Sequence, residues 1–132
     1  MVASSRVETL RPIYAEWGKG NFASGQPLYA RDLVHTGFVA DGRVTTQGLE
    51  EFRGWIRDFF SQWDRYRVVA EEFTELDDDI VLVAGRQYAT GKQSGVEVEA
   101  PVFNVWIFRG EQVAALHFDT DRERALEAAG VL

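Results

Sequence analysis

The chain has 132 residues, 45% of them hydrophobic, and a formal net charge of −7. Such a length and composition are typical of a globular chain, and we expect one domain over residues 1–132. The acidic balance argues against nucleic acid or an anionic membrane surface as a partner, because binding phosphate needs a concentrated basic face. Since the sequence has no cysteine, disulfides, thiolate metal sites and a cysteine nucleophile are excluded.

Nothing in the sequence predicts a membrane protein or an exported one. Residues 1–12 lack the apolar core of a signal peptide. No apolar run is long enough to span a bilayer. We therefore expect a soluble protein of the cytoplasm.

The first part of the chain predicts a helix with one buried face. Apolar residues spaced by three or four run from Val7 to Trp17, and the serines at 4–5 are the candidate caps. Pro12 does not fit the interior of a long helix. We therefore expect a ragged start, followed by a helix through Tyr14 and Trp17 that extends toward Phe22.

The next segment predicts a short helix and a short strand. The pair Gln26-Pro27 opens a helix that is expected to continue to Leu33. Residues 34–39, VHTGFV, are expected to form a strand that ends at the turn Asp41-Gly42.

The strongest helical signal follows. Apolar residues from Leu49 to Trp63 recur at spacings of three and four, with Thr46 as the candidate N-cap. The apolar stripe is wide and strongly aromatic. We expect this helix to lie across the concave face of a sheet.

From Tyr66 onward the period changes to that of strands. We expect strands over 67–74 and 80–90, an acidic turn at 77–79, and a stretch from 96–100 that leads into a hairpin over 102–119. A short helix over 121–129 closes the chain. Helices first and antiparallel strands afterwards predict an α+β fold, with helices gathered on one face of a curved sheet.

The hairpin over 102–119 turns at 109–112 and is apolar on both faces. Alternation places Asn104 on one face with Trp106 and Phe108. Cover is therefore expected on both sides, from a helix or from a partner subunit. Asn104 is the single amide among these aromatic residues, where an unpaired polar group would be costly.

Histidine and aspartate are the available acid–base groups. His117 and Asp119 share one face of a strand and could form a dyad, but that face is expected to be exposed or to contact a partner subunit. The other histidine, His35, is far away in sequence, so no metal site is predicted. The aspartates at 77–79 lack the spaced ligands of a calcium loop. Because glycine-rich phosphate-binding patterns are also missing, no cofactor is expected.

Aromatic and polar residues from several elements could converge on one pocket. An apolar cavity with a few placed polar groups is the usual form of a small-molecule site. The alternative is that the same side chains fill the core solidly. The candidate ligand-binding residues are Tyr14, Trp17, Phe59, Phe60, Trp63, Tyr88, Asn104, Trp106 and Phe118.

Several stretches together carry a family resemblance. A long helix that leads into the sheet of one protein family is similar to TTQGLEEFRGWIRDFF and the following SQWDRYRV. The central strands of that family are similar to DDDIVLVAGRQYATGKQSGVEVEAPVFNVWIFRGEQV. A common C-terminal ending of its members is similar to DRERALEAAGVL. In this order they resemble the SnoaL-like proteins of the NTF2-like superfamily. That superfamily includes polyketide cyclases, ketosteroid isomerases and limonene-epoxide hydrolases. The resemblance covers nearly all of the chain.

The resemblance implies an NTF2-like (cystatin-like) cone. In this fold a strongly curved mixed, mostly antiparallel sheet wraps against about three helices and encloses an apolar pocket. The resemblance also implies a homodimer that forms through the outer face of the sheet.

The resemblance further assigns positions to catalytic groups. Ketosteroid isomerases build an oxyanion hole from a tyrosine and a protonated aspartate, whose positions match Tyr14 and Asn104, and their base falls at Gly37. Polyketide cyclases place a histidine at the position of Asn104 and a catalytic aspartate where Phe118 stands, next to Asp119. The Asp-Arg-Asp set of the epoxide hydrolases is not assembled by this sequence.

Three functions stay open. The first is a homodimeric domain that binds a small, largely apolar, carbonyl-bearing molecule, with Tyr14 and Asn104 at its polar end. The second is a proton-transfer enzyme of the cyclase or isomerase type, for which Tyr14, His35 and Asp119 are the candidate catalytic residues, with Asp41 as a further base. The third is a dimerisation module with a vestigial pocket.

Overall fold

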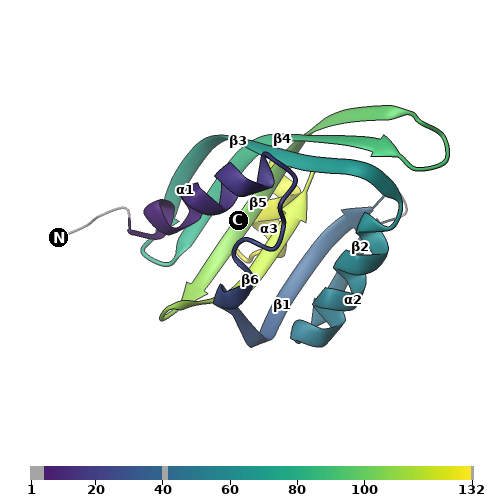
Figure 1. Cartoon of the computed structure of the whole chain (residues 1–132). Helices are drawn as coiled ribbons and strands as arrows, with labels where there is room; N and C mark the ends of the chain where they lie inside the picture. The colour runs from purple at the N-terminus through teal and green to yellow at the C-terminus, as the bar shows by residue number, and fades with distance from the viewer. Residues whose placement is uncertain (1–4, 40–41, 132) are drawn as a thin grey trace.

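The computed structural model describes residues 5–39 and 42–131 (Figure 1). A six-stranded sheet has the order β2-β1-β6-β5-β4-β3. It is mixed, because β1 pairs with β6 in parallel and the other neighbours pair antiparallel. The elements are α1 (Ser5–Trp17), the 3-10 turn η1 (Gln26–Leu28), β1 (Tyr29–Val39), β2 (Gly42–Gln47), α2 (Leu49–Phe60), β3 (Trp63–Asp77), β4 (Ile80–Gly91), β5 (Glu97–Arg109), β6 (Gln112–Asp119) and α3 (Arg122–Ala128).

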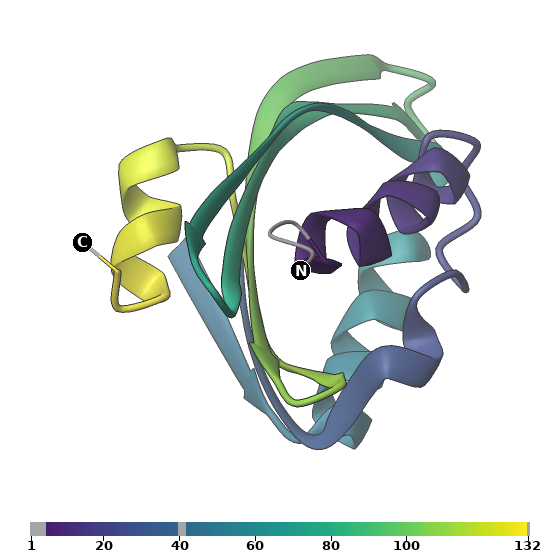
Figure 2. The same ribbon diagram turned by 90° about the vertical axis from the view of Figure 1, so that its left-hand side faces the viewer.

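The helices divide between the two faces of the curved sheet. Figure 2 shows α1 and α2 on the concave side and α3 on the outer side. The larger apolar core lies between α1, α2 and the concave face, around Trp106 and Leu116. A smaller one lies under α3, where Leu82, Val105 and Ala125 are fully buried. The predicted α+β fold with a curved mixed sheet is confirmed. The expectation that the helices gather on one face is wrong, because α3 covers the β5–β6 hairpin from the outer side.

Helix α1 differs from the expected ragged start. It runs unbroken from Ser5 through Pro12, which is exposed, and it ends at Trp17 without reaching Phe22. The buried face from Val7 to Trp17 holds the helix against the sheet. Packing of that face outweighs the local cost of proline. Ser4, one of the two candidate caps, lies outside the described residues.

The prediction of a helix over residues 26–33 is wrong. Only the single turn η1 forms, and β1 begins at Tyr29. The reason is tertiary: Tyr29 and Leu33 belong to the larger core, and β1 pairs in parallel with β6. Asp32 is consequently on a strand, where it forms an exposed ion pair with Arg109 at 2.7 Å.

Strand β2 was not expected, and the predicted N-cap is wrong. Thr46 lies in β2, where it is buried and pairs with His35 across the ladder. The N-cap of α2 is Gly48, whose φ of 92° lies in the left-handed region that favours glycine. Of the turn expected at Asp41-Gly42, Asp41 lies outside the described residues.

Helix α2 confirms the long aromatic helix, with one change at its end. It stops at Phe60, and Trp63 is the first residue of β3. Only Phe52 is fully buried in α2, whereas the other aromatic residues of its inner side are half-buried. The inner side therefore faces a space that the core does not fill. No helix in the described part of the chain is long and apolar enough to cross a membrane.

Candidate functional site

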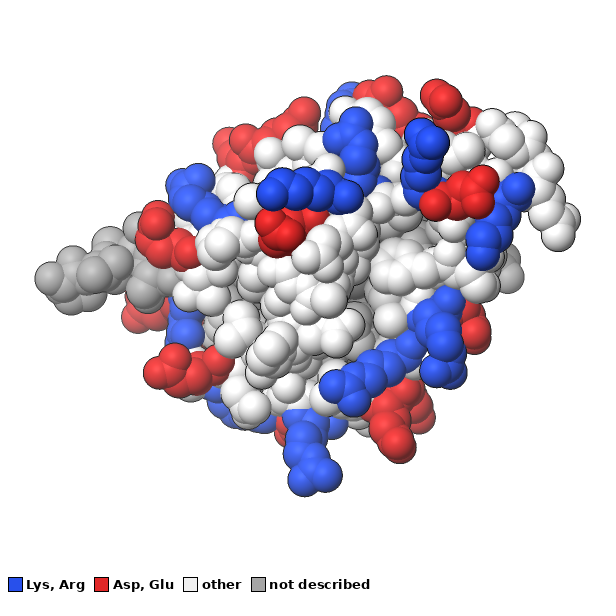
Figure 3. Space-filling view, in the orientation of Figure 1, with Lys and Arg blue, Asp and Glu red and all other residues white. Residues whose placement is uncertain are grey.

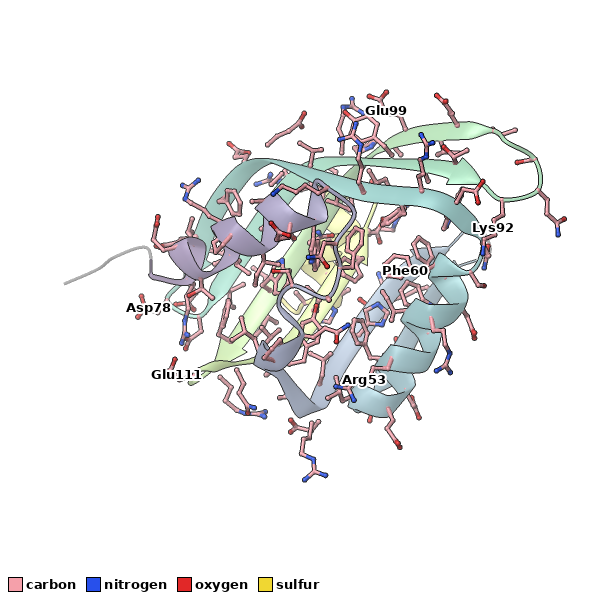
Figure 4. The ribbon with its side chains drawn as sticks, viewed as in Figure 1. Arg53, Phe60, Asp78, Lys92, Glu99 and Glu111 are labelled. Carbon is pink, nitrogen blue, oxygen red and sulfur yellow. The ribbon has the colours of Figure 1, made fainter. Side chains whose placement is uncertain are left out.

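A cavity of about 490 Å³ lies in the concave face, between the sheet, α2 and the loop after α1. Figure 3 shows an uncharged surface at the centre of this side of the molecule, with Lys, Arg, Asp and Glu toward its margin. Phe60 of α2 lies over this central region in Figure 4. The lining residues are Trp17, Gly20, Phe22, Ala23, Gln26, Tyr29, Phe52, Trp55, Ile56, Phe59, Phe60, Trp63, Asp64, Tyr66, Val68, Gln87, Val102, Asn104, Phe118, Asp119 and Thr120.

Seven rings form a closed circuit of neighbouring contacts at this cavity. Each ring centroid lies between 4.5 and 6.4 Å from the next. The contacts are edge-to-face, tilted or, between Trp55 and Phe59, stacked, and aromatic pairs of this kind stabilise a cluster beyond simple burial. Six of the seven residues line the cavity, and His35 packs directly behind two of them. In order, the circuit is Trp17, Phe22, Phe60, Phe59, Trp55, His35 and Phe118.

The lining is neutral or acidic. Among the described residues that line the cavity, none is Lys or Arg. Burial raises the pKa of the phenols of Tyr29 and Tyr66, so both are uncharged at neutral pH. The carboxylates are those of Asp64, which is exposed, and Asp119, which forms an ion pair with Arg124 on α3. A buried anionic group on a ligand would therefore meet no cation.

Asn104 is anchored by α1. Its amide nitrogen donates to Tyr14 Oη at 2.7 Å, and the indole nitrogen of Trp106 donates to the same oxygen at 2.7 Å. Burial is the main reason that the pKa of Tyr14 is raised, so its hydroxyl keeps its proton. In this arrangement Asn104 Oδ1 is buried and has no partner.

If the Asn104 amide is turned by 180°, the hydrogen bonds among Tyr14, Asn104 and Trp106 are satisfied more fully. Amide oxygen and nitrogen exchange places in such a rotation, and the hydrogen bonds decide between the two orientations. The Tyr14 hydroxyl then donates to Oδ1 while still accepting from Trp106. The amide NH₂ becomes the unpartnered group. In the better-satisfied orientation, the cavity residue Asn104 therefore offers a hydrogen-bond donor.

His35 is buried behind the cavity lining and neutral. Its Nδ1 lies 3.1 Å from Thr46 Oγ1, and its Nε2 is buried without a partner. Burial, with a smaller contribution from His117, lowers the pKa of His35 to about 3. An imidazole with so low a pKa is a poor match for a general base near neutral pH.

Gly37 is the position at which the resemblance places the isomerase base, and a side chain there would have to displace Trp55. A Cβ at this position would lie 2.8 Å from the Trp55 ring and 3.3 Å from His35 Cε1. The Trp55 indole therefore fills the space that a carboxylate at position 37 would need. Proton transfer from that position is excluded in this arrangement of the chain.

His117 and Asp119 do not form a dyad, and their face is not exposed. Both are buried, at 5% and 4% exposure. Nδ1 of His117 lies 2.7 Å from Thr36 Oγ1, and Asp119 binds Arg124 at 3.0 Å. Burial lowers the pKa of His117 to about 4, and Arg43 adds to this effect. In the described residues, no group of three or more His, Asp or Glu is placed to hold a metal ion.

The predicted pocket residues separate into three groups. Lining the cavity are Trp17, Phe59, Phe60, Trp63, Asn104 and Phe118. Tyr14 and Trp106 lie behind it and hold Asn104. Tyr88 lies on the outer face, with the Arg67 guanidinium 4.2 Å from its ring centroid.

Several lining residues were not among the predicted ones. Tyr66 donates to Gln87 Oε1 at 2.7 Å, and both side chains belong to the concave face. The strand predicted over 67–74 begins too late to include Tyr66. Side chains alternate between the two faces of a strand, so counting back from Val68 along the same strand would have placed Tyr66 on the same face as Val68. Phe22 comes from a loop, for which periodicity gives no signal.

The comparisons with known proteins agree with this architecture. The model of the SnoaL-like domain family matches residues 10–116. The chain belongs to the SnoaL-like family. No curated protein matches the sequence.

Solved structures show the fold. An NTF2-like protein of unknown function from Burkholderia pseudomallei has a TM-score of 0.76 and 19% identity, over 94% of this chain and 96% of that one. A candidate SnoaL-like polyketide cyclase from Jannaschia sp. CCS1 has a TM-score of 0.75 and 18% identity, over 98% and 94%. A protein of ketosteroid isomerase-like fold from Catenulispora acidiphila, in complex with trimethylamine, has a TM-score of 0.69 and 19% identity, over 99% and 96%. The predicted NTF2-like fold is confirmed.

Proposed function

We propose that residues 1–132 act as one SnoaL-like domain that binds a small, uncharged, largely apolar molecule with a carbonyl group. The aromatic circuit would enclose the apolar body of this molecule, and Asn104 would donate a hydrogen bond to the carbonyl oxygen. A cavity of about 490 Å³ lies within the usual range for such ligands.

One observation carries this proposal. Three buried side-chain atoms of the described residues have no hydrogen-bond partner, and they belong to His35, Trp63 and Asn104. Trp63 and Asn104 line the cavity, and His35 packs behind Trp55 and Phe118, which line it. Leaving a buried polar group unpaired costs about 1–3 kcal/mol. A solidly filled core gives no reason for three such groups to gather here, whereas a ligand site does.

Tyr14 acts in this proposal through Asn104. Its hydroxyl is bonded to Asn104 and to Trp106 and does not line the cavity, so it would position the amide without touching the ligand. This differs from a role as a direct oxyanion donor. The Catenulispora structure has trimethylamine as its ligand, an amine without a carbonyl, so it favours a small-molecule site but not the carbonyl.

A ligand-induced melting experiment tests the proposal. Wild-type protein is heated with 6-ethyl-1-tetralone, a flat cyclic ketone, and with 6-ethyltetralin, which lacks the oxygen. We expect the ketone to raise Tm by several degrees and the hydrocarbon to raise it less. Asn104→Leu should abolish the difference between the two compounds, and Tyr14→Phe should reduce it. Tyr88→Phe is the matched control, because it removes a tyrosine hydroxyl from the outer face. Equal shifts in all four proteins would overturn the assignment.

Proton transfer is the second candidate function, because His35 Nε2 is buried without a partner beside the cavity lining. In this candidate His35 would be the base and Asn104 would polarise the carbonyl. The test is exchange of the α-protons of 6-ethyl-1-tetralone in D₂O, followed by NMR with wild type and His35→Asn. Exchange that exceeds the buffer rate in wild type and is lost in the variant would favour it. The lowered pKa of His35 leads us to expect no excess exchange at neutral pH.

A homodimer through the outer face of the sheet is the remaining part of the proposal. Helix α3 covers the region around Val105, so a partner would contact the uncovered part near β3 and β4. Arg67 stacks on Tyr88 there, and Arg86 pairs with Glu99. Light scattering coupled to size exclusion measures the mass directly. A dimer that Tyr88→Glu dissociates would support this surface, and a wild-type monomer would end this part of the proposal.

A further inference from the structure

Trp63 carries a hydrogen-bond donor for which residues 5–39 and 42–131 supply no acceptor. Its Nε1 is buried and has no partner, and its side chain lines the cavity. An indole N–H can only donate. Trp17 is different, because its Nε1 donates to the carbonyl of Ser24 at 3.2 Å. Of the three tryptophans that line the cavity, Trp17 therefore has its donor used within the chain, whereas Trp63 has its donor free.

Trp63 and Asn104 lie at separate places along the sheet. The register pairs Asn104 with Val83 of β4, and Val83 with Phe73 of β3. Trp63 pairs with Gly91 at the other end of the same two strands. It stands near the end of α2, where the backbone N–H of Lys92 donates to the Gln62 carbonyl at 3.1 Å.

We infer that the ligand carries two hydrogen-bond acceptor oxygens, one bound by Asn104 and a second, at the opposite end, bound by Trp63. Because no Lys or Arg is among the described lining residues, both oxygens belong to neutral groups such as ketones, esters or ethers and not to carboxylates. This inference rests on the proposed function and adds to it a specificity-determining residue. Trp63 discriminates ligands that have the second oxygen from ligands that are apolar at that end.

A matched pair of compounds tests the role of Trp63. The two probes are 6-acetyl-1-tetralone and 6-ethyl-1-tetralone, which share the ring ketone and differ in the oxygen at the far end. Binding is measured by isothermal titration calorimetry with wild type and Trp63→Phe, which keeps a ring and removes the N–H. A neutral hydrogen bond contributes about 0.5–1.5 kcal/mol, so we expect Trp63→Phe to weaken the acetyl compound about three- to tenfold. The ethyl compound should change less than about twofold, since it makes no bond to lose.

Trp17→Phe is the control, because it removes a lining indole whose N–H is already bonded within the chain. It should weaken both probes alike. The inference is overturned if Trp63→Phe also weakens both probes alike, or if Trp17→Phe discriminates between them as strongly. Those outcomes leave the ketone site at Asn104 intact. Failure of wild type to bind either probe would instead count against the proposed function itself.

Indole N–H resonances give a second readout that needs no folded variant at position 63. In ¹⁵N-labelled wild type, the acetyl probe should move the Trp63 indole proton downfield, and the ethyl probe should not. Trp17 should respond similarly to both. A Trp63 resonance that moves equally with the two probes would contradict a hydrogen bond to the second oxygen.

Discussion

The two faces of the sheet bury polar side chains in different ways. On the outer face, His117 is bonded to Thr36. Asp119, at the end of β6, also borders the cavity, but it is bonded to Arg124 of α3 and to the backbone of Asp121. On the concave face, His35, Trp63 and Asn104 each keep one buried polar atom without a partner. Buried polar groups without a protein partner need an explanation, because they are costly in a finished core. This difference supports the proposal that the outer network stabilises the fold and that the concave face binds a ligand.

Loss of the outer ion pair is expected to have the largest effect on stability. Arg124→Met keeps the aliphatic stem but leaves the Asp119 carboxylate, whose side chain is 3% exposed, without its cation. Breaking a buried pair costs about 3–5 kcal/mol, and the partly exposed arginine places this one at about 2–3 kcal/mol. Urea unfolding measures the change, and Arg11→Met, in an exposed pair with Glu8, is the control with an expected change below about 1 kcal/mol.

Ligand binding should survive the loss of Arg124. The melting shift with 6-ethyl-1-tetralone is expected to persist in Arg124→Met at a lower starting Tm. If the variant loses the shift but remains folded, the separation between a structural outer face and a binding inner face is wrong.

Acid is expected to destabilise both faces through their histidines. The pKa values of His35 and His117 fall from 6.5 to about 3 and about 4 on folding. Between about pH 6.5 and pH 4 the unfolded chain therefore binds protons that the folded chain does not, and stability falls as the pH falls through this window. Each histidine contributes at most about 1.4 kcal/mol per pH unit.

Variants separate the two histidines from the carboxylates that also titrate in acid. His35→Asn and His117→Asn should each reduce the slope of stability against pH between pH 6.5 and 5, when measured by urea unfolding. Direct titration by NMR should find neither imidazole protonated at pH 5. A normal pKa for His35 would mean that its ring is not buried behind the cavity.

Gly37→Ala probes the contact between the concave face and α2. The added Cβ would approach the Trp55 ring to 2.8 Å, so the indole must move. Overpacking of this kind costs about 1–3 kcal/mol, and we expect about 1–2 because Trp55 is only half-buried. The displaced ring should also reduce ketone binding. Gly54→Ala is the control within α2, since the added Cβ would lie 3.8 Å from the end of the Arg57 side chain and alanine favours helix.

The sequence predicted the elements whose periodicity is strong and missed those that tertiary pairing determines. The aromatic stripe of α2 and the alternation of the β5–β6 hairpin identified both elements. Strand β2, GRVTTQ, has few apolar residues and buries only Thr46, so alternation gave little signal. The start of β1 at Tyr29 was hidden by the preceding Gln-Pro pair, and its parallel pairing with β6 spans most of the chain.

The sequence predicted which types of residue form the site, but it predicted less well which of them line the cavity and which lie behind it. Asn104 stood out as an amide among aromatic residues, and it does line the cavity. That Tyr14 lies behind it, and not beside it, depends on where α1 crosses the sheet. Trp63 was expected because it is aromatic. Periodicity does not distinguish the free N–H of Trp63 from the N–H of Trp17, which is bonded to Ser24, because both depend on where backbone carbonyls lie in the folded chain.

The smallest stability change and the largest loss of binding are expected from one substitution, Asn104→Leu. Leucine has nearly the shape of asparagine and removes the amide group that lacks a partner, but the Tyr14 hydroxyl then loses its acceptor. Tyr14 still accepts from Trp106. One unpartnered group replaces another, so the unfolding free energy should fall by about 1 kcal/mol, the contribution of the lost hydrogen bond. Calorimetry with 6-ethyl-1-tetralone should find binding weakened at least about tenfold, since the carbonyl then enters the cavity without a donor. A large loss of stability with unchanged binding would assign Asn104 to the core and reverse the contrast between the two faces.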